Sequence, residues 1–229
     1  MSRGMRAVEG DVPFARRVPW RMVLPRRGRG PAPVLVALHG KGDRADRFEA
    51  EALDALPAGW ALLLPSGPVP RDRHPAKGGV SLGDSWYLYD GDTAAFRASL
   101  DAAEAHLLRV LRAARRRASL RPAALLGFSQ GAYLAGVVGV RHPGIFRAVV
   151  QVAGRLKVEM LGPLFPAARG LRLLGLHGSR DVSVKPAPSR ESLAVAREAG
   201  LDAEFREFDA GHEFSPEMRH AAKGWLSAL

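Results

Sequence analysis

Three residues whose types could carry out nucleophilic chemistry lie far apart in the sequence: Ser129, Asp181 and His212. The serine lies at the centre of a Gly-Phe-Ser-Gln-Gly segment, a pattern in which a sharp turn lifts the hydroxyl clear of a sheet. A histidine can accept the serine proton near neutral pH, and a carboxylate can fix the tautomer of the imidazole and stabilise its charged form. These residue types therefore predict a serine that attacks an acyl carbonyl, provided that the fold brings the three together.

The sequence around Ser129 predicts a strand, a sharp turn and a buried helix. Residues 123–126 are apolar, and small and apolar residues recur at helical spacing after Gly131. Glycine is expected at positions 127 and 131 because side chains there would collide with the neighbouring strand and helix. The alternative is a glycine-rich turn that carries an inert serine.

A second loop that could contact a ligand follows the continuous apolar segment 34–38. Such a segment is typical of a central parallel strand that is buried on both faces. It leads into His39-Gly40-Lys41-Gly42-Asp43, where two glycines allow the backbone N–H groups to approach a ligand. His39 could take part in catalysis, but a histidine at a strand end more often holds its loop by hydrogen bonds.

Helices and strands alternate along the rest of the chain. The helix at residues 45–56 is expected to turn Phe48, Leu53 and Leu56 inward, and Thr93 is the expected N-cap of a long helix. His106, beside the apolar stripe of that helix, is expected at its surface or boundary. Helices are also predicted at 187–199 and 216–228, and strands at 20–24, 60–64, 146–152, 171–176 and 203–208.

Residues 65–92 break the pattern and predict a long functional loop. The aromatic cluster at Trp86 and Tyr87 could cover a substrate pocket or fill the core beneath the loop. Together with His39, these two residues are the candidates for a substrate pocket.

Composition excludes several classes of function. The chain of 229 residues is 47% hydrophobic, which is enough for one α/β domain at 31–229 after an irregular arm with an edge strand at 1–30. It contains no cysteine, so covalent catalysis must use another residue. No apolar run is long enough for a membrane span and no secretory signal is visible, which predicts a soluble, cytoplasmic protein. The net charge of +11 comes from scattered arginines without interleaved aromatics, so nucleic acid is not an expected partner.

The order of the candidate residues favours one architecture. Ser129, Asp181 and His212 each follow a predicted strand, and the carboxyl ends of parallel strands meet at the same edge of a sheet. Serine, then aspartate, then histidine is the chain order of an α/β-hydrolase. The sequence therefore predicts a single-domain α/β-hydrolase fold with a mostly parallel central sheet flanked by helices.

Motifs along residues 33–229 resemble those of the phospholipase/carboxylesterase family of small α/β-hydrolases, which includes acyl-protein thioesterases. The resemblance implies a serine esterase that uses no metal and no organic cofactor and acts as a monomer or homodimer on a small-molecule ester or thioester. It also implies an oxyanion hole formed by the backbone N–H groups of Lys41 and Gln130. The motifs are Leu38-His39-Gly40 with Gly42-Asp43, Leu64-Pro65-Ser66-Gly67-Pro68, Ser85-Trp86-Tyr87, the Ser129 turn, His177-Gly178 with Asp181, and Gly211-His212.

Two positions depart from the pattern of that family. Lys41 stands where a leucine is common, and Val182 follows Asp181 where a proline is usual. A hydrated ammonium beside the oxyanion loop predicts a preference for short acyl chains. Two alternatives remain open: a hydrolase of another acyl substrate, such as a lactone or a peptide, and a binding protein built on a hydrolase scaffold.

Overall fold

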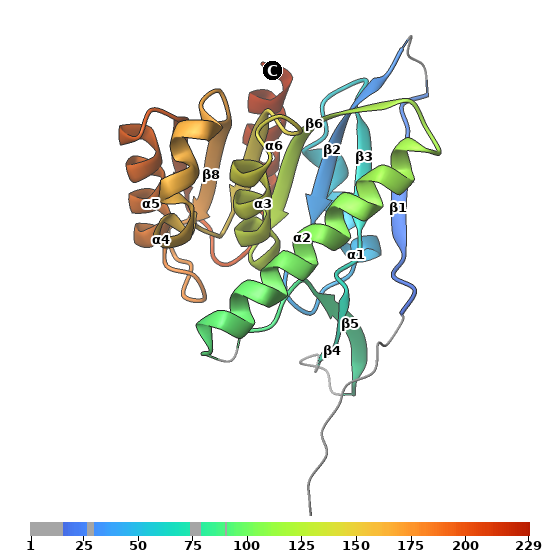
Figure 1. The fold of residues 1–229 in the computed structure, drawn as a ribbon, viewed down its shortest axis with the longest axis horizontal. Helices are drawn as coiled ribbons and strands as arrows, with labels where there is room; N and C mark the ends of the chain where they lie inside the picture. Colours follow the sequence, from blue (N-terminus) through green and yellow to red (C-terminus); the bar gives the residue numbers. More distant parts are fainter. Residues whose placement is uncertain (1–15, 27–29, 74–78, 90) are drawn as a thin grey trace, which may run out of the picture.

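The computed structural model describes residues 16–26, 30–73, 79–89 and 91–229. A seven-stranded sheet runs through these residues, with helices packed on both faces (Figure 1). Its strand order is β1-β3-β2-β6-β7-β8-β9, and every pairing is parallel except that of β1 with β3. The predicted mostly parallel sheet is confirmed. The strands are β1 (Trp20–Val23), β2 (Ala32–Leu38), β3 (Ala61–Pro65), β6 (Leu120–Phe128), β7 (Ala148–Val152), β8 (Arg172–Gly178) and β9 (Asp202–Phe208).

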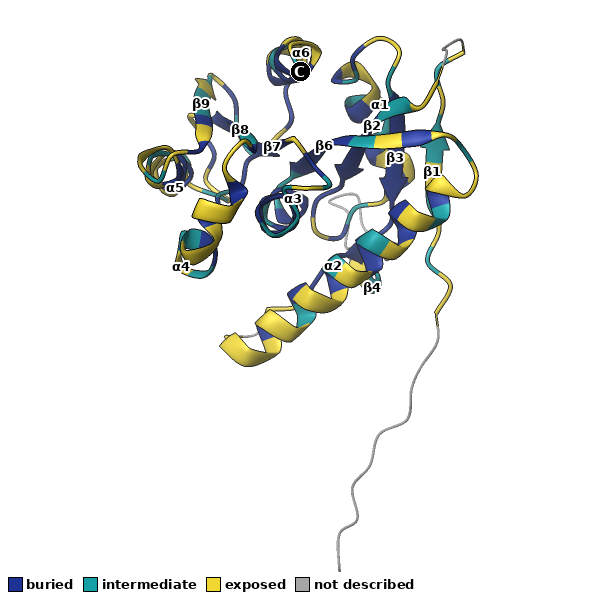
Figure 2. Cartoon of the chain, turned by 45° about the horizontal axis from the view of Figure 1, so that its top comes forward, coloured by how far each residue is buried: buried dark blue, intermediate teal, exposed yellow. Residues whose placement is uncertain are grey.

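The helices divide into two layers, each with its own apolar core. One core lies under the long helix α2 together with α3 and α5, and the other lies under α1 and α6, as the burial of their inner faces in Figure 2 shows. Strands β2, β6, β7 and β8 contribute to both cores because their successive side chains point to opposite faces. The helices are α1 (Ala45–Asp54), α2 (Thr93–Arg115), α3 (Gln130–Arg141), α4 (Val158–Leu161), α5 (Pro186–Glu198) and α6 (Pro216–Ser227), with a 3₁₀ helix at Gly162–Ala168.

The two edges of the sheet differ in character. Strand β1 is the predicted edge strand of the N-terminal arm, and it pairs antiparallel with β3. Strand β9 forms the other edge and carries charged residues at positions 202, 204, 206 and 207.

Residues 1–15 and 27–29 of the expected arm lie outside the described residues. Within the described ranges, no helix is long and apolar enough to cross a membrane.

The expectation of a long loop at residues 65–92 is wrong in part. Strands β4 (Val69–Arg73) and β5 (Ser81–Ser85) form an antiparallel hairpin within it. These strands carry charged and polar residues instead of an alternating apolar face, which is why the sequence does not indicate them. The hairpin is fixed instead by a bridge between Asp84 and Asp43 of the loop after β2.

Three local expectations about helices are also wrong. The N-cap of α2 is Asp92, whose carboxylate accepts the N–H groups of Ala94 and Ala95, so Thr93 is the first helical residue. Leu53 is exposed, because the inner face of α1 is formed by Ala45, Phe48 and Ala52. His106 is buried and bonded, as described below.

Candidate active site

Ser129 lies on a strained turn between strand β6 and helix α3. Its φ of 51° and ψ of −115° fall in a region that side-chain-bearing residues rarely adopt. A Cβ at Gly127 would collide with the backbone of Gly131, and a Cβ at Gly131 would collide with the carbonyl of Leu38 in β2. The two glycines of the turn are therefore required by close backbone approach, as the sequence predicted.

The structure brings Ser129, His212 and Asp181 into one chain of hydrogen bonds. The Ser129 hydroxyl lies 3.0 Å from Nε2 of His212, and Nδ1 of His212 lies 2.7 Å from Oδ2 of Asp181. With Nδ1–H donating to the carboxylate, Nε2 is left as the acceptor of the serine proton. The geometry is that of a nucleophile, a base and an orienting acid.

Asp181 is held in the loop after β8 by groups that favour its ionised form. Burial opposes ionisation, but hydrogen bonds from the N–H groups of Val184 and Ser183 and from His212 outweigh it and lower the pKa of Asp181 below its ordinary value. The side chain of His177 closes the same loop by donating from Nε2 to the Val184 carbonyl at 2.7 Å. A carboxylate kept charged beside His212 is suited to stabilise a protonated imidazole.

His212 reaches Ser129 from the loop that follows β9. This loop is tied to the Asp181 loop by the N–H of Arg180, which donates to the Ala210 carbonyl at 3.0 Å. Gly178 has no room for a side chain because Ala210 and Gly211 press against it. The ring of Phe128 packs against the imidazole with their centroids 5.1 Å apart. These contacts limit the freedom of the His212 ring.

Lys41, in the loop after β2, lines the same cavity as Ser129, and Gln130 directly follows Ser129 as the first residue of α3. Within the described residues, neither of their backbone N–H groups donates a hydrogen bond to another group. The loop is braced by the hairpin: the Gly42 N–H donates to the Asp84 carbonyl, and the Asp84 N–H donates to the Asp43 carbonyl, both at 2.8 Å. Gly42 has φ 72°, which glycine adopts without strain.

Of the three candidates for a substrate pocket, His39 and Trp86 lie beneath the site. Both are fully buried and line neither cavity near Ser129. His39 donates from Nδ1 to the Gly40 carbonyl and accepts the Gly67 N–H at Nε2, so it holds two loops together. Burial lowers its pKa, while the bond to Gly40 acts in the opposite direction. The indole N–H of Trp86 donates to the His39 carbonyl at 2.8 Å.

The side chain of Gln130 has a role that the sequence analysis missed. Its Oε1 accepts the Trp86 N–H at 3.0 Å, and its Nε2 donates to the Tyr87 carbonyl at 2.8 Å. It therefore fixes the segment after β5 against the start of α3. The sequence analysis gave a role only to the backbone N–H of Gln130, which directly follows the serine. No pattern in the sequence indicated a role for its side chain.

Two adjoining cavities open beside Ser129, and Lys41 lines both. The cavity at Ser129 measures about 350 Å³ and its neighbour about 250 Å³. Tyr87, the third candidate, lines the second cavity together with Tyr89 and Arg71. The first is lined by Gly40, Lys41, Gly42, Asp43, Phe128, Ser129, Ser183 and His212, and the second by Lys41, Arg71, Tyr87, Leu88, Tyr89 and Gln130.

A search for metal ligands gives no candidate in the described part of the chain. No group of three or more His, Cys, Asp or Glu side chains in those residues could hold an ion.

A mostly parallel sheet with a serine on the turn after β6, an aspartate after β8 and a histidine after β9 defines the α/β-hydrolase fold. Solved structures of that fold resemble this chain over nearly its whole length. Esterase PE8 matches with a TM-score of 0.74 at 22% identity, covering 93% of this chain and 99% of its own. A carboxylesterase from Mesorhizobium loti gives 0.74 at 22% identity, with 93% and 95% covered. Acyl-protein thioesterase 2 from Zea mays gives 0.71 at 21% identity, with 92% and 98% covered.

No family model matches the sequence. At these identities the likeness to solved structures establishes the fold, and the activity has to be argued from the site.

Proposed function

We propose that this protein is a serine hydrolase that cleaves carboxylic esters, with thioesters as further candidate substrates, through an acyl-enzyme on Ser129. The observation that carries the proposal is the unbroken chain of hydrogen bonds from Ser129 through His212 to Asp181. Structural neighbours described as an esterase, a carboxylesterase and an acyl-protein thioesterase support the same class of reaction.

The first half of the reaction forms the acyl-enzyme. Ser129 Oγ attacks the acyl carbonyl carbon while Nε2 of His212 takes the hydroxyl proton, and Asp181 stabilises the imidazolium that results. His212 then delivers that proton to the departing alcohol or thiol as the bond between the acyl carbon and the leaving group breaks. In the second half, His212 takes a proton from water, and the resulting attack releases the acid and restores Ser129.

The negative charge on the tetrahedral intermediate needs donors that are already in place. The N–H groups of Lys41 and Gln130 are free of other partners among the described residues and flank the Ser129 turn. The N-terminus of α3, which begins at Gln130, adds the positive end of its dipole. We therefore assign these two N–H groups as the oxyanion hole.

The lining of the second cavity favours small acyl groups over long ones. Lys41 and Arg71 keep charged groups in a space of about 250 Å³ that also contacts Tyr87 and Tyr89. A long alkyl chain gains about 0.8 kcal/mol per buried methylene only where its surroundings are apolar. Short or compact acyl esters are the proposed substrates.

The proposal is tested by replacing the nucleophile. Ser129→Ala should lower ester hydrolysis at least ~10³-fold and abolish labelling by a fluorophosphonate probe, because no other residue would carry the acyl group. The matched control is Ser183→Ala, which removes another hydroxyl from the same cavity and should keep both activities. Near-normal activity in Ser129→Ala would show that the nucleophile is misassigned.

The same assay separates the alternatives. A protein that takes the probe but hydrolyses neither esters nor thioesters would favour a lactone or peptide substrate. A protein that takes no probe and hydrolyses nothing would favour a binding function on a hydrolase scaffold.

A further inference from the structure

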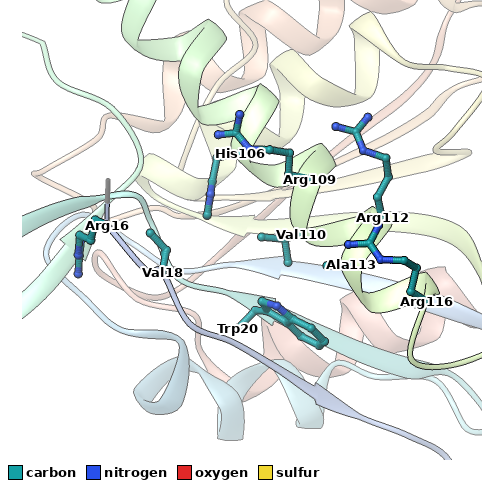
Figure 3. Close-up of a pocket in the computed structure, with 9 residues that line it drawn as sticks. All are labelled: Arg16, Val18, Trp20, His106, Arg109, Val110, Arg112, Ala113 and Arg116. Carbon is teal, nitrogen blue, oxygen red and sulfur yellow. The ribbon is translucent and has the colours of Figure 1, made fainter. Parts of the chain in front are cut away.

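A third cavity, of about 450 Å³, lies away from Ser129, between helix α2 and the segment that leads into strand β1. None of the described residues that line it also lines a cavity beside Ser129. Figure 3 shows arginines of α2 on one side and Trp20 on the other. Its lining consists of Arg16, Val18, Trp20, His106, Arg109, Val110, Arg112, Ala113 and Arg116.

The charge of this cavity is strongly positive and largely uncompensated. Of the residues that the structure describes, four arginines and no acidic residue line it. Arg16 is held in place by an ion pair with Asp84 at 3.0 Å and by a bond to the Pro68 carbonyl. Among the described residues, Arg109, Arg112 and Arg116 form no ion pair. Three of the four guanidinium groups therefore remain available to an anion.

The dipole of helix α2 does not explain this cluster. Cations in the last turn of a helix are stabilised by its negative end, which accounts for Arg112 and Arg116. Arg109 lies before the last turn, and Arg16 comes from another part of the chain across the cavity. Like charges three or four positions apart on a helix repel one another and destabilise it slightly. A bound anion would reduce this repulsion.

Arginines of this cavity act electrostatically on the buried side chain of His106. Its Nε2–H donates to the Ser66 carbonyl at 3.0 Å. Burial is the main cause that lowers the pKa of His106, the bond to Ser66 opposes it, and the positive charges of Arg109 and Arg16 lower it further. The only charges acting on this imidazole that are identified in the described structure are thus those of two cavity arginines.

The dimensions of the cavity favour a particular kind of anion. Arg109 and Arg116 are seven residues apart, roughly 10 Å along the helix, which exceeds the width of one phosphate group. Trp20, Val110 and Ala113 form an apolar wall next to the charges, and an indole can stack on a planar ring. We propose that this cavity binds a small organic molecule that carries two or more phosphate groups and a planar ring, the chemistry of a nucleoside di- or triphosphate.

Two larger partners for the same charges fit less well. The volume of about 450 Å³ is in the range of small-molecule sites, whereas a membrane surface would need a basic face broader than these four arginines. A single-stranded nucleic acid needs several aromatic platforms along a basic groove, and Trp20 is the only Phe, Tyr or Trp among the described residues that line this one.

The test is a calorimetric titration of the full chain with adenosine triphosphate and, separately, with inorganic tripolyphosphate. The nucleotide should bind more tightly than tripolyphosphate because it alone can use Trp20. Arg109→Gln and Arg112→Gln should each weaken nucleotide binding about tenfold, the loss typical of one charge-assisted contact. Trp20→Leu should weaken binding of the nucleotide and leave tripolyphosphate unaffected.

The matched control is Arg115→Gln, which removes an exposed arginine from the same end of α2 outside the cavity. It should bind the nucleotide as the unaltered protein does. An equal loss in Arg115→Gln, or equal binding of tripolyphosphate and nucleotide, would overturn the proposal. So would tighter binding to phosphatidylserine-containing vesicles or to a single-stranded oligonucleotide than to the nucleotide.

Discussion

Ser129 combines a strained backbone with a hydroxyl that is already bonded to its proposed base. The strain at φ 51° is maintained by the strand and helix on either side, and by the Ser129 N–H, which donates to the Val152 carbonyl at 2.9 Å. Side-chain replacement at this position removes the hydroxyl without removing those contacts. Loss of activity in Ser129→Ala is therefore expected without loss of the fold.

The role of the acid is tested at Asp181. Asp181→Asn should lower kcat by orders of magnitude, because an amide donor facing His212 Nδ1 favours the imidazole tautomer that cannot accept the Ser129 proton. The readout is kcat for a short-chain ester across the pH range, with unfolding measured in parallel.

Two nearby carboxylates serve as controls for that substitution. Asp209 pairs with Arg180 at the surface, and Glu213 is exposed. Asp209→Asn and Glu213→Gln should each retain most of the activity. If Asp181→Asn kept its kcat while the variant at either control position lost activity, the acid would be misassigned.

The residues that could be predicted are those whose role follows from their place after a strand. Ser129, Asp181 and His212 each follow a recognisable apolar segment, so their meeting at one edge of the sheet could be expected from chain order. His39 holds its loop by hydrogen bonds, the more common of the two roles expected for it, but its partner Gly67, 28 positions away, could not be predicted. The role of the Gln130 side chain could not be predicted either, because its partners lie 43 and 44 positions away. A one-dimensional pattern carries no information about such partners.

Among the elements, the hairpin β4–β5 matters most to the site and was not predicted. Its bonds to Gly42 and Asp43 hold the loop after β2, and Arg71 of β4 lines the cavity beside Lys41. Its polar strands are stabilised by pairing and by contact with that loop, so hydrophobic periodicity gives no signal. The long helix α2, by contrast, was predicted from its apolar stripe, and Phe96, Leu100 and Leu107 of that stripe are buried.

The charged lining of this region leads to a prediction about acyl length. Lys41→Leu should shift the optimum of kcat/KM toward longer acyl chains, because each methylene then buried gains about 0.8 kcal/mol. The backbone N–H of residue 41 remains, so hydrolysis of acetate esters should persist. The measurement is kcat/KM for a series of esters from about C2 to C16 in both forms.

Lys223→Leu is the control for this series, since Lys223 is exposed on α6 and lines neither cavity. Its chain-length profile should match that of the unaltered protein. A wild-type optimum at long chains, or the same profile in Lys41→Leu, would remove Lys41 from any role in selectivity.

For the molecule as a whole, two buried histidines predict a loss of stability in mild acid. Burial is the main cause that lowers the pKa of both His39 and His106. In the unfolded chain such imidazoles take up protons below about pH 6.5, while the folded state resists protonation. The unfolded state then binds more protons, so the free energy of unfolding should fall as pH drops from 6.5 through the lowered folded values.

Urea unfolding at pH 7.5, 6.5 and 5.5 measures this dependence. The double variant His39→Gln with His106→Gln should show a smaller change between pH 6.5 and 5.5, whatever its stability at pH 7.5. His220→Gln is the control, because His220 is exposed on α6, and it should keep the full change. If the free energy of unfolding of the double variant falls just as much between pH 6.5 and 5.5, the acid sensitivity arises from other groups.

Strand β9 shapes how copies of this protein meet one another. An edge strand offers a row of backbone groups on which a foreign strand can extend the sheet, the first step toward fibrils. Along β9, Asp202, Glu204, Arg206 and Glu207 intersperse charges of both signs with the apolar residues, and Arg190 of α5 pairs with Glu207 beside the edge. A strand that paired with this edge would have to desolvate these charged side chains, which is unfavourable. The charges along β9 therefore disfavour extension of the sheet at this edge.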